Sequence, residues 1–173
     1  MSTKKLIKAL GLIIVVALLA AALPLQAKAQ GGTPDTSWYG DGTATSFTLT
    51  DADDLAGLAV LVNGGNSFEG KSILLGNDIS ISTYTNWTPI GTVDHPFKGT
   101  FDGVGKKISD LSINNSTAVN VGLFGRVWPG TLKNVSIENV EISAKESVGS
   151  LVGSMNGTIE NVHVSDVTIN STH

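Results

Sequence analysis

Two acids and a histidine in one short stretch are the first residues to consider for chemistry. Asp94, His95 and Asp102 fall within "VDHPFKGTFDG", where a carboxylate and an imidazole could share a site. Glycoside hydrolysis uses a pair of carboxylates, and proton abstraction from a sugar uses a base close to the reacting carbon. The same residues also fit turns, because "VDHPF" and "FDG" combine Asp with Pro or Gly. We expect turns here and no catalytic centre.

The other potential ligands and nucleophiles are scattered. The three histidines, His95, His163 and His173, lie far apart, none is followed by Glu, and the chain has no cysteine. This excludes a thiol nucleophile and the common histidine and cysteine zinc motifs. No glycine pattern typical of a phosphate loop opens a helix. The sequence therefore predicts no catalytic residue, no cofactor and no metal site, and we expect a protein that is not an enzyme.

Aromatic side chains are the candidates for ligand binding. Tyr84, Trp87 and Trp128 could stack against sugar rings, because exposed aromatic residues mark binding surfaces. The alternative is a structural role, in which Trp87 packs near the N-terminal end of the fold and Trp128 shields a loop beside Pro129. The sequence leaves both interpretations of these three residues open.

The elements that would position such residues come from a repeat. The stretch "NVGLFGRVWPGTLKNVSIENVEIS" (120–143) returns as "SVGSLVGSMNGTIENVHVSDVTIN" (147–170), at an offset of 27 residues from Val121 to Val148. A weaker copy, "KKISDLSI", aligns 24 residues upstream of the first, with its Ile108 at the position of Leu132. Short strands repeating at this spacing cannot bury a face alone, but they can when stacked in register. The pattern predicts a β-solenoid.

Apolar residues alternate within each repeat as they do in strands. Val135 and Ile137 lie two apart on one strand face, and the "EN" that follows is typical of a turn. A polar column, formed by Asp110, Asn134 and Asn161, precedes the inward residue of each turn, and we expect it to be a hydrogen-bonded turn ladder. The predicted core columns are Ile108, Leu132 and Ile159; Leu111, Val135 and Val162; and Ile113, Ile137 and Val164.

One segment ahead of the repeat predicts a helix. In "TDADDLAGLAVLVNGG" apolar residues recur with helical spacing over about 52–62, and Thr50 or Asp51 can cap its N-terminus. A short amphipathic helix here would cover the open end of the solenoid core. We expect the cap and the first turns of the coil over 47–106, and the repeat turns over 107–173.

The N-terminus has the features of a secretory signal peptide. Residues 1–29 contain a lysine-rich start, an apolar run and a small-x-small "AKA" ending, so we expect cleavage after Ala29 and a flexible lead-in over 30–46. An uncleaved N-terminal anchor is the alternative. The remainder keeps seven basic and fifteen acidic residues, a net charge of −8. Such a chain is a poor ligand for nucleic acid or anionic membranes, and we expect a secreted, extracellular protein associated with the cell surface.

Five motifs together carry a family resemblance. The stretches "DLAGLAVLVNGGNSFEGKSILLGNDISIS", "WTPIGT", "PFKGTFDGVGKKISDLSI", "VGLFGRV" and "VGSLVGSMNGTIENV" resemble the GLUG-repeat β-helix region of large bacterial surface proteins, over about 47–171. The resemblance implies an all-β, right-handed parallel β-helix on an exported protein. Such regions occur in adhesin-like proteins, in accessory parts of secreted carbohydrate-active enzymes and beside the catalytic part of IgA-cleaving metallopeptidases. No catalytic residue comes with these motifs.

Two functions are expected ahead of a third, a stand-alone glycan hydrolase or lyase. The first is a non-catalytic repeat module of a bacterial surface or adhesin-like protein, acting as a scaffold or in adhesion or glycan binding. The second is an accessory domain of a secreted carbohydrate-active enzyme or peptidase whose catalytic part is elsewhere. Partners would be a surface glycan, a host or extracellular protein, or further repeats of the same polypeptide. Because neither a helix nor a polar loop follows Ile169, we expect an exposed last turn and a truncated C-terminus.

Overall fold

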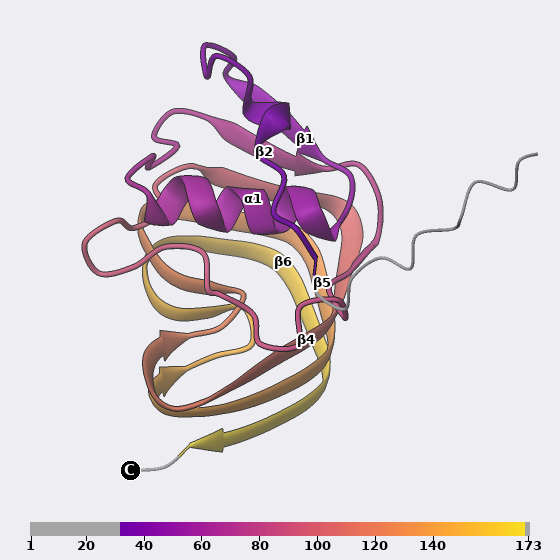
Figure 1. Ribbon diagram of the computed structural model, residues 1–173, viewed down its shortest axis with the longest axis vertical. Coiled ribbons are helices and arrows are strands. Elements are labelled where there is room, and N and C mark those ends of the chain that lie inside the picture. The colour runs from indigo at the N-terminus through magenta and orange to yellow at the C-terminus, as the bar shows by residue number, and fades with distance from the viewer. Residues whose placement is uncertain (1–31, 172–173) are drawn as a thin grey trace, which may run out of the picture.

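The computed structural model describes residues 32–171, which form one strand-rich coil with a single α-helix near its beginning (Figure 1). The predicted signal peptide, 1–29, lies outside the described residues. In chain order the elements are η1 (Ser37–Tyr39), β1 (Ser46–Leu49), α1 (Ala52–Asn63), β2 (Ser72–Leu75), β3 (Ile79–Ser80), β4 (Thr100–Val121), β5 (Phe124–Val148) and β6 (Val152–Ser171).

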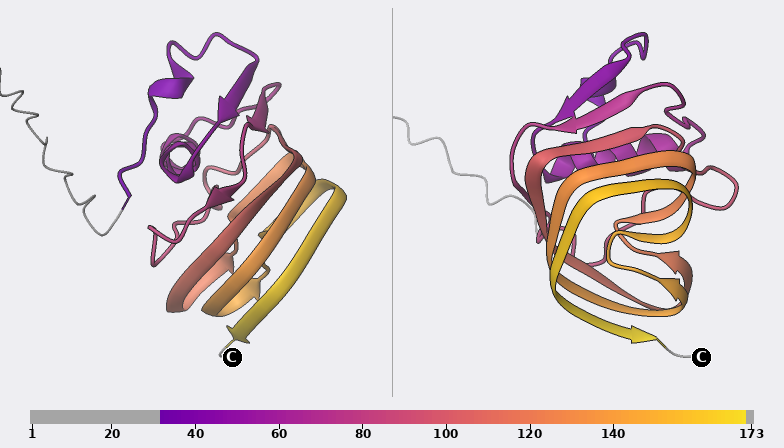
Figure 2. Two further views of the ribbon diagram at one scale, coloured as in Figure 1. Left: turned by 90° about the vertical axis from the view of Figure 1, so that its right-hand side faces the viewer. Right: turned by 180° about the vertical axis from the view of Figure 1, so that it is seen from behind.

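The long strands β4, β5 and β6 wind around the coil and stack on one another in parallel (Figure 2). The sheet runs in the order β1-β2-β4-β5-β6, and β3 pairs with β4. These strands bend at residues with left-handed backbone angles: Asp110, Asn139 and Asp166 have φ of 65°, 54° and 52°. Asn and Asp adopt this conformation more readily than other side-chain-bearing residues. The predicted parallel β-solenoid is confirmed.

The register of the last two turns is confirmed, whereas the predicted alignment of the preceding turn is wrong. β5 pairs with β6 at the 27-residue offset, with Ile137 opposite Val164. β4 pairs with β5 so that Ile108 lies opposite Ile137 and not opposite Leu132. The apolar spacing i, i+3, i+5 of "KKISDLSI" occurs twice in β5, and the strand pairing selects the later occurrence. The observed core columns are Phe101, Leu132 and Ile159; Ile108, Ile137 and Val164; Leu111, Val140 and Val167; and Ile113, Ile142 and Ile169, while Val135 and Val162 stack on Lys106.

A row of phenylalanines links the turns inside the coil. Phe68 contacts Phe97 with ring centroids 6.3 Å apart, and Phe97 contacts Phe124 at 5.4 Å. Phe124 in turn meets Phe101 edge to face at 5.2 Å. Offset and edge-to-face ring pairs add to the burial energy of the aromatic side chains. All four rings are buried, so this row is the centre of the core and no part of a surface.

Helix α1 closes the N-terminal end of the coil, as predicted. Asp51 is its N-cap: the side chain accepts hydrogen bonds from the backbone N–H groups of Asp53 and Asp54 at 2.9 and 3.0 Å. The apolar face, which includes Leu55 and Leu58, is buried, because it lies against the core of the first turns. In the left view of Figure 2, α1 and β6 lie at opposite ends of the stack of strands.

The segment expected to be a flexible lead-in is instead packed against the first turn, over the part of it that the structure describes. The indole of Trp38 donates a hydrogen bond to the Asp54 carbonyl at 3.2 Å, and its ring contacts Phe47 edge to face. The Asp35 N–H donates to the Asp53 carbonyl at 2.9 Å. Trp38 and Tyr39 both contact the buried Phe47, so residues 32–46 are part of the N-terminal cap.

Candidate functional site

The three residues considered first for chemistry do not form one site. Asp94 and His95 lie on an exposed loop, where His95 Nδ1 is 2.8 Å from the Asn63 carbonyl oxygen. Asp102 belongs to the stacked strands: its carboxylate accepts a hydrogen bond from Asn134 at 3.0 Å and pairs with the Lys133 ammonium at 3.3 Å. The structure thus assigns Asp102 to the stack, apart from the loop that holds the imidazole.

Asp102 is also held in its ionised form. Partial burial opposes ionisation, but the hydrogen bonds from Asn134 and Val104 and the positive charge of Lys133 outweigh it, so the pKa of Asp102 lies below its ordinary value. A carboxylate whose pKa is lowered in this way is a poor general acid near neutral pH, because a general acid there needs a raised pKa. Within residues 32–171, no three His, Asp or Glu side chains are grouped so that they could hold a metal ion.

The predicted turn ladder exists, with one member replaced. Asn161 Nδ2 donates to Asn134 Oδ1 at 3.0 Å, and Asn134 Nδ2 donates to Asp102 Oδ1 at 3.0 Å. The prediction placed Asp110 in this column, which is wrong, because it followed the same misaligned repeat as the core columns. The ladder Asp102–Asn134–Asn161 supports one corner of the coil with amide and carboxylate hydrogen bonds from each turn to the next.

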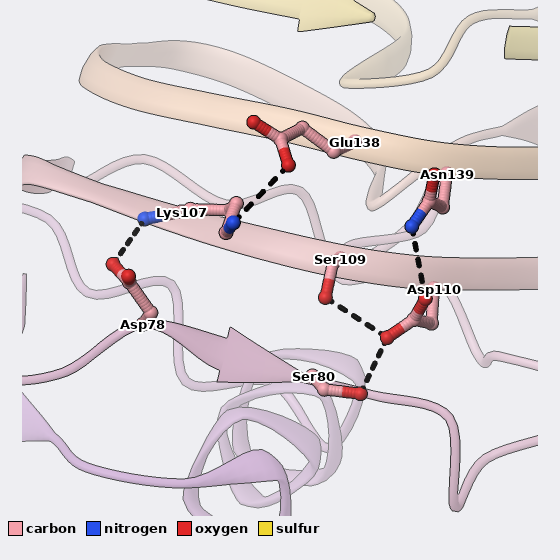
Figure 3. A network of polar contacts seen from close by, with 7 residues as sticks. All are labelled: Asp78, Ser80, Lys107, Ser109, Asp110, Glu138 and Asn139. Atoms are coloured by element: carbon pink, nitrogen blue, oxygen red, sulfur yellow. Dashed lines mark hydrogen bonds and ion pairs between the residues drawn. The ribbon is translucent and has the colours of Figure 1, made fainter. Parts of the chain in front are cut away.

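Asp110 supports a second corner (Figure 3). Its carboxylate accepts hydrogen bonds from the Ser80 hydroxyl at 2.6 Å, from the Ser109 hydroxyl at 2.9 Å and from Asn139 Nδ2 at 3.3 Å. These contacts, that of Ser80 foremost, lower the pKa of Asp110. Beside it, the Lys107 ammonium of β4 forms an ion pair with Glu138 in the adjacent turn, β5, at 3.2 Å. The network therefore joins β3, β4 and β5, and each of its acids serves as a fixed acceptor.

Trp87 is not available to a ligand in the way that a sugar platform requires. Its residue surface is 2% exposed, and its indole N–H donates to the Leu123 carbonyl at 3.0 Å. Tyr84 packs edge to face on Trp87, with ring centroids 5.7 Å apart, and its hydroxyl donates to Asp53 at 2.9 Å. Burial, followed by this contact with the Asp53 carboxylate, raises the pKa of Tyr84. The two rings form one wall of a mostly apolar cavity of about 250 Å³ against α1.

Trp128 remains as the candidate contact residue. It is 42% exposed, and the Arg126 guanidinium carbon lies 4.7 Å from its ring centroid, so one cation stacks on the indole. The ring borders a groove of about 450 Å³, which we call the Trp128 groove. Its lining combines an aromatic ring with an acid, an imidazole and an ammonium group: Gly65, Ser67, Asp94, His95, Pro96, Lys98, Trp128 and Pro129.

The groove gathers loops that are distant in the sequence. Lys98 is held beside it by an ion pair with Glu69 at 3.7 Å, and Asn63, at the end of α1, positions His95. An aromatic ring next to hydrogen-bonding groups is suited to hold a sugar, whose apolar ring face stacks while its hydroxyls bond to the polar groups. Sequence reasoning found Trp128 but missed Lys98, because only the coiling of the chain brings the loop of Lys98 beside Trp128. It also missed Arg126, although this residue lies only two positions before Trp128 on β5.

The known proteins that this chain resembles are much longer than it is, and each match covers only a small part of their length. No protein-family model and no solved structure matches it. It is 36% identical over 135 residues to Halomucin of Haloquadratum walsbyi, a match of 72% of this chain but 2% of Halomucin. It is 32% identical over 93 residues to a Gly-rich membrane protein of Evansella cellulosilytica, over 50% of this chain and 11% of that protein. None of the helices formed by residues 32–171 is long and apolar enough to cross a membrane.

Proposed function

We propose that this protein is an exported, non-catalytic β-solenoid repeat module of a surface or adhesin-like protein, acting as a scaffold and in glycan binding. The observation that carries the proposal is that the recurring polar residues form hydrogen bonds between turns of the coil. Asn134, Asn161 and Asp110 hydrogen-bond to neighbouring turns, so the repeated polar residues stabilise the stacking of the turns. The match to a small part of Halomucin agrees with a module that larger surface proteins contain. The GLUG-repeat resemblance belongs to the same proposal.

The glycan-binding part of the proposal rests on the Trp128 groove. Trp128 would stack on the sugar ring, and Asp94, His95 and Lys98 would contact its hydroxyls. Truncating a Trp at the centre of a binding site commonly costs more than 1.4 kcal/mol, which corresponds to about tenfold in affinity. We therefore expect Trp128→Ala to weaken binding to any glycan that the protein captures from an array by about tenfold or more.

Two control variants separate stacking from general surface effects. Trp128→Phe retains an aromatic face and should keep most of the affinity. Val60→Ala truncates another exposed apolar side chain, 52% exposed on α1, and should leave binding unchanged. Glycan binding that survives Trp128→Ala would remove this groove from the proposal, and a protein that captures no glycan would reduce it to the scaffold role.

The non-catalytic part is tested by incubation with polysaccharides. We expect no new reducing ends and no unsaturated products from pectins and related polymers, with or without Ca²⁺. Reproducible product release that scales with protein concentration would contradict the proposal, and loss of that release in Asp94→Asn would place the reaction in the Trp128 groove.

A further inference from the structure

The last turn of the coil has a free edge with an apolar surface behind it. β6 ends the strand order of the sheet, so within the described residues one edge of its 20 residues has no partner strand. Leu132 of β5 is fully buried, whereas Ile159, its register partner in β6, is 50% exposed. Val164, Val167 and Ile169 are also exposed, by 39 to 41%. These four side chains continue the core columns of the coil. They are exposed because no further turn of the described residues packs on them.

The polar columns specify what would cover this edge. In the ladder, each Asn donates its amide to the preceding turn and offers its carbonyl oxygen to the next, as Asn134 does between Asp102 and Asn161. Asn161 Oδ1 accepts no hydrogen bond within the described part of the chain. A covering strand would therefore present an amide donor at this position.

The charges along the neighbouring column alternate. Asp102, Lys133 and Glu160 lie opposite one another in successive turns, and the first two form an ion pair at 3.3 Å. The next position in the series calls for a cation opposite Glu160. At the second corner, Asn139 of β5 donates a hydrogen bond to Asp110 of β4. Asp166 has the equivalent position in β6, where its carboxylate is the outermost acceptor of this corner. A covering strand would again place a donor there.

A second copy of this chain does not meet these requirements. At its N-terminal end the sheet stops at β1, which has only four residues, and α1 closes the core there. The only edge long enough to match the 20 residues of β6 within the described residues is therefore the β6 of the second copy, paired antiparallel about a two-fold axis. β6 contains Glu160 and Asp166 but no Lys or Arg. Such a dimer would bring two acidic edges together and would supply no cation for either glutamate.

From these columns we infer that β6 is the docking edge for a further parallel turn of the same repeat, which carries a Lys or Arg opposite Glu160 and Asn residues opposite Asn161 and Asp166. The inference deepens the proposed function, because it makes the module one segment of a longer stack. The sequence of β5 from Leu132 to Ile142, "LKNVSIENVEI", already has this pattern. Its Lys133, Asn134 and Asn139 would occupy the three positions, and its apolar residues would cover the four exposed side chains.

The test adds such a turn in register. A copy of residues 120–144 fused directly after His173 keeps the 27-residue offset, so the copied lysine falls opposite Glu160. We expect amide hydrogen exchange in β6 to slow by at least tenfold, because the free edge becomes paired, while exchange in α1 changes little. Unchanged exchange in β6 would overturn the inference, whatever the outcome of the glycan experiments.

A charge exchange shows whether the columns specify the partner. Replacing the copied lysine by glutamate should reduce the protection of β6 by about two- to fivefold, in keeping with a surface ion pair, whereas replacing it by arginine should keep the protection. Equal protection with lysine and with glutamate would refute the charge requirement. Sedimentation of the unfused protein completes the test: a dimer whose β6 amides are already protected would show that a second copy covers this edge and would overturn the inference.

Discussion

Two isoleucines in one core column provide a matched test of the stacked structure. Ile142 in β5 and Ile169 in β6 are register partners on the same face of their strands. Ile142 is fully buried, whereas Ile169 is 39% exposed because no further turn of the described residues covers it. Replacing each by Ala makes the same chemical change in the same strand position. The difference between the two variants therefore reports the covering turn alone, since the loss of β propensity cancels.

The size of the effect follows from the burial. Ile→Ala removes three carbons, which at ~0.8 kcal/mol each is about 2.4 kcal/mol for a fully buried side chain. An enclosed cavity adds to this cost, so Ile142→Ala should lower the free energy of unfolding by about 3–4 kcal/mol. The space left by Ile169→Ala opens to solvent and creates no enclosed cavity, and only part of the side chain is buried. We expect a loss of about 1–1.5 kcal/mol there.

Urea unfolding followed by circular dichroism measures both losses, provided that the slope with denaturant is the same for all variants. The reasoning would be refuted if the two variants lost equal stability, within about 0.5 kcal/mol. Sedimentation at the same concentration then distinguishes the causes. An oligomer would mean that Ile169 is covered in solution, and a monomer would mean that the two residues do not share a column.

Three further predictions concern the corners, the stacking distance and the cap. Hydrogen bonds, that from Ser80 first, hold the pKa of Asp110 below 3.8, so its ionised form stabilises the fold above that pH and the contribution is lost as the pH falls through the lower folded-state value. Asp110→Asn should flatten the fall in Tm below about pH 4, measured by calorimetry. Gly153→Ala should cost about 1–3 kcal/mol in urea unfolding, because its Cβ would meet the backbone of the preceding turn. Gly76→Ala should cost less, because the nearest atom to its Cβ would be a threonine methyl at 3.1 Å. Asp51→Ala should cost about 0.5–2 kcal/mol in the same assay, and an unchanged midpoint would contradict its role as N-cap.

Much of the fold could be predicted because its signals are local. The 27-residue repeat showed which residues of β5 and β6 stack, and this register is confirmed by the pairing of Ile137 with Val164. The helix over Ala52–Asn63 was also predictable, since its capping Asp51 directly precedes it and its apolar spacing lies within it. Such features need no knowledge of distant contacts.

The alignment of the earlier turn could not be derived in the same way. Its apolar spacing fits β5 at two positions, and only the pairing of whole strands decides that Ile108 stacks on Ile137. The error moved Asp110 into the wrong column and hid the part of Asp102 in the ladder. Register between parallel strands is set by packing over their full length, and a short motif contains too little of it.

For the candidate site, the sequence by itself determined which residue types were present and that none of the common catalytic or zinc motifs was among them. Only the tertiary structure decided that Trp87 is buried, that Trp128 is exposed, and that Asp94, His95 and Lys98 line the same groove as Trp128. The physical reason is the coil itself. Each turn returns the chain to the same face, so neighbours on the surface are about one repeat apart in sequence, and exposure depends on whether another turn lies above.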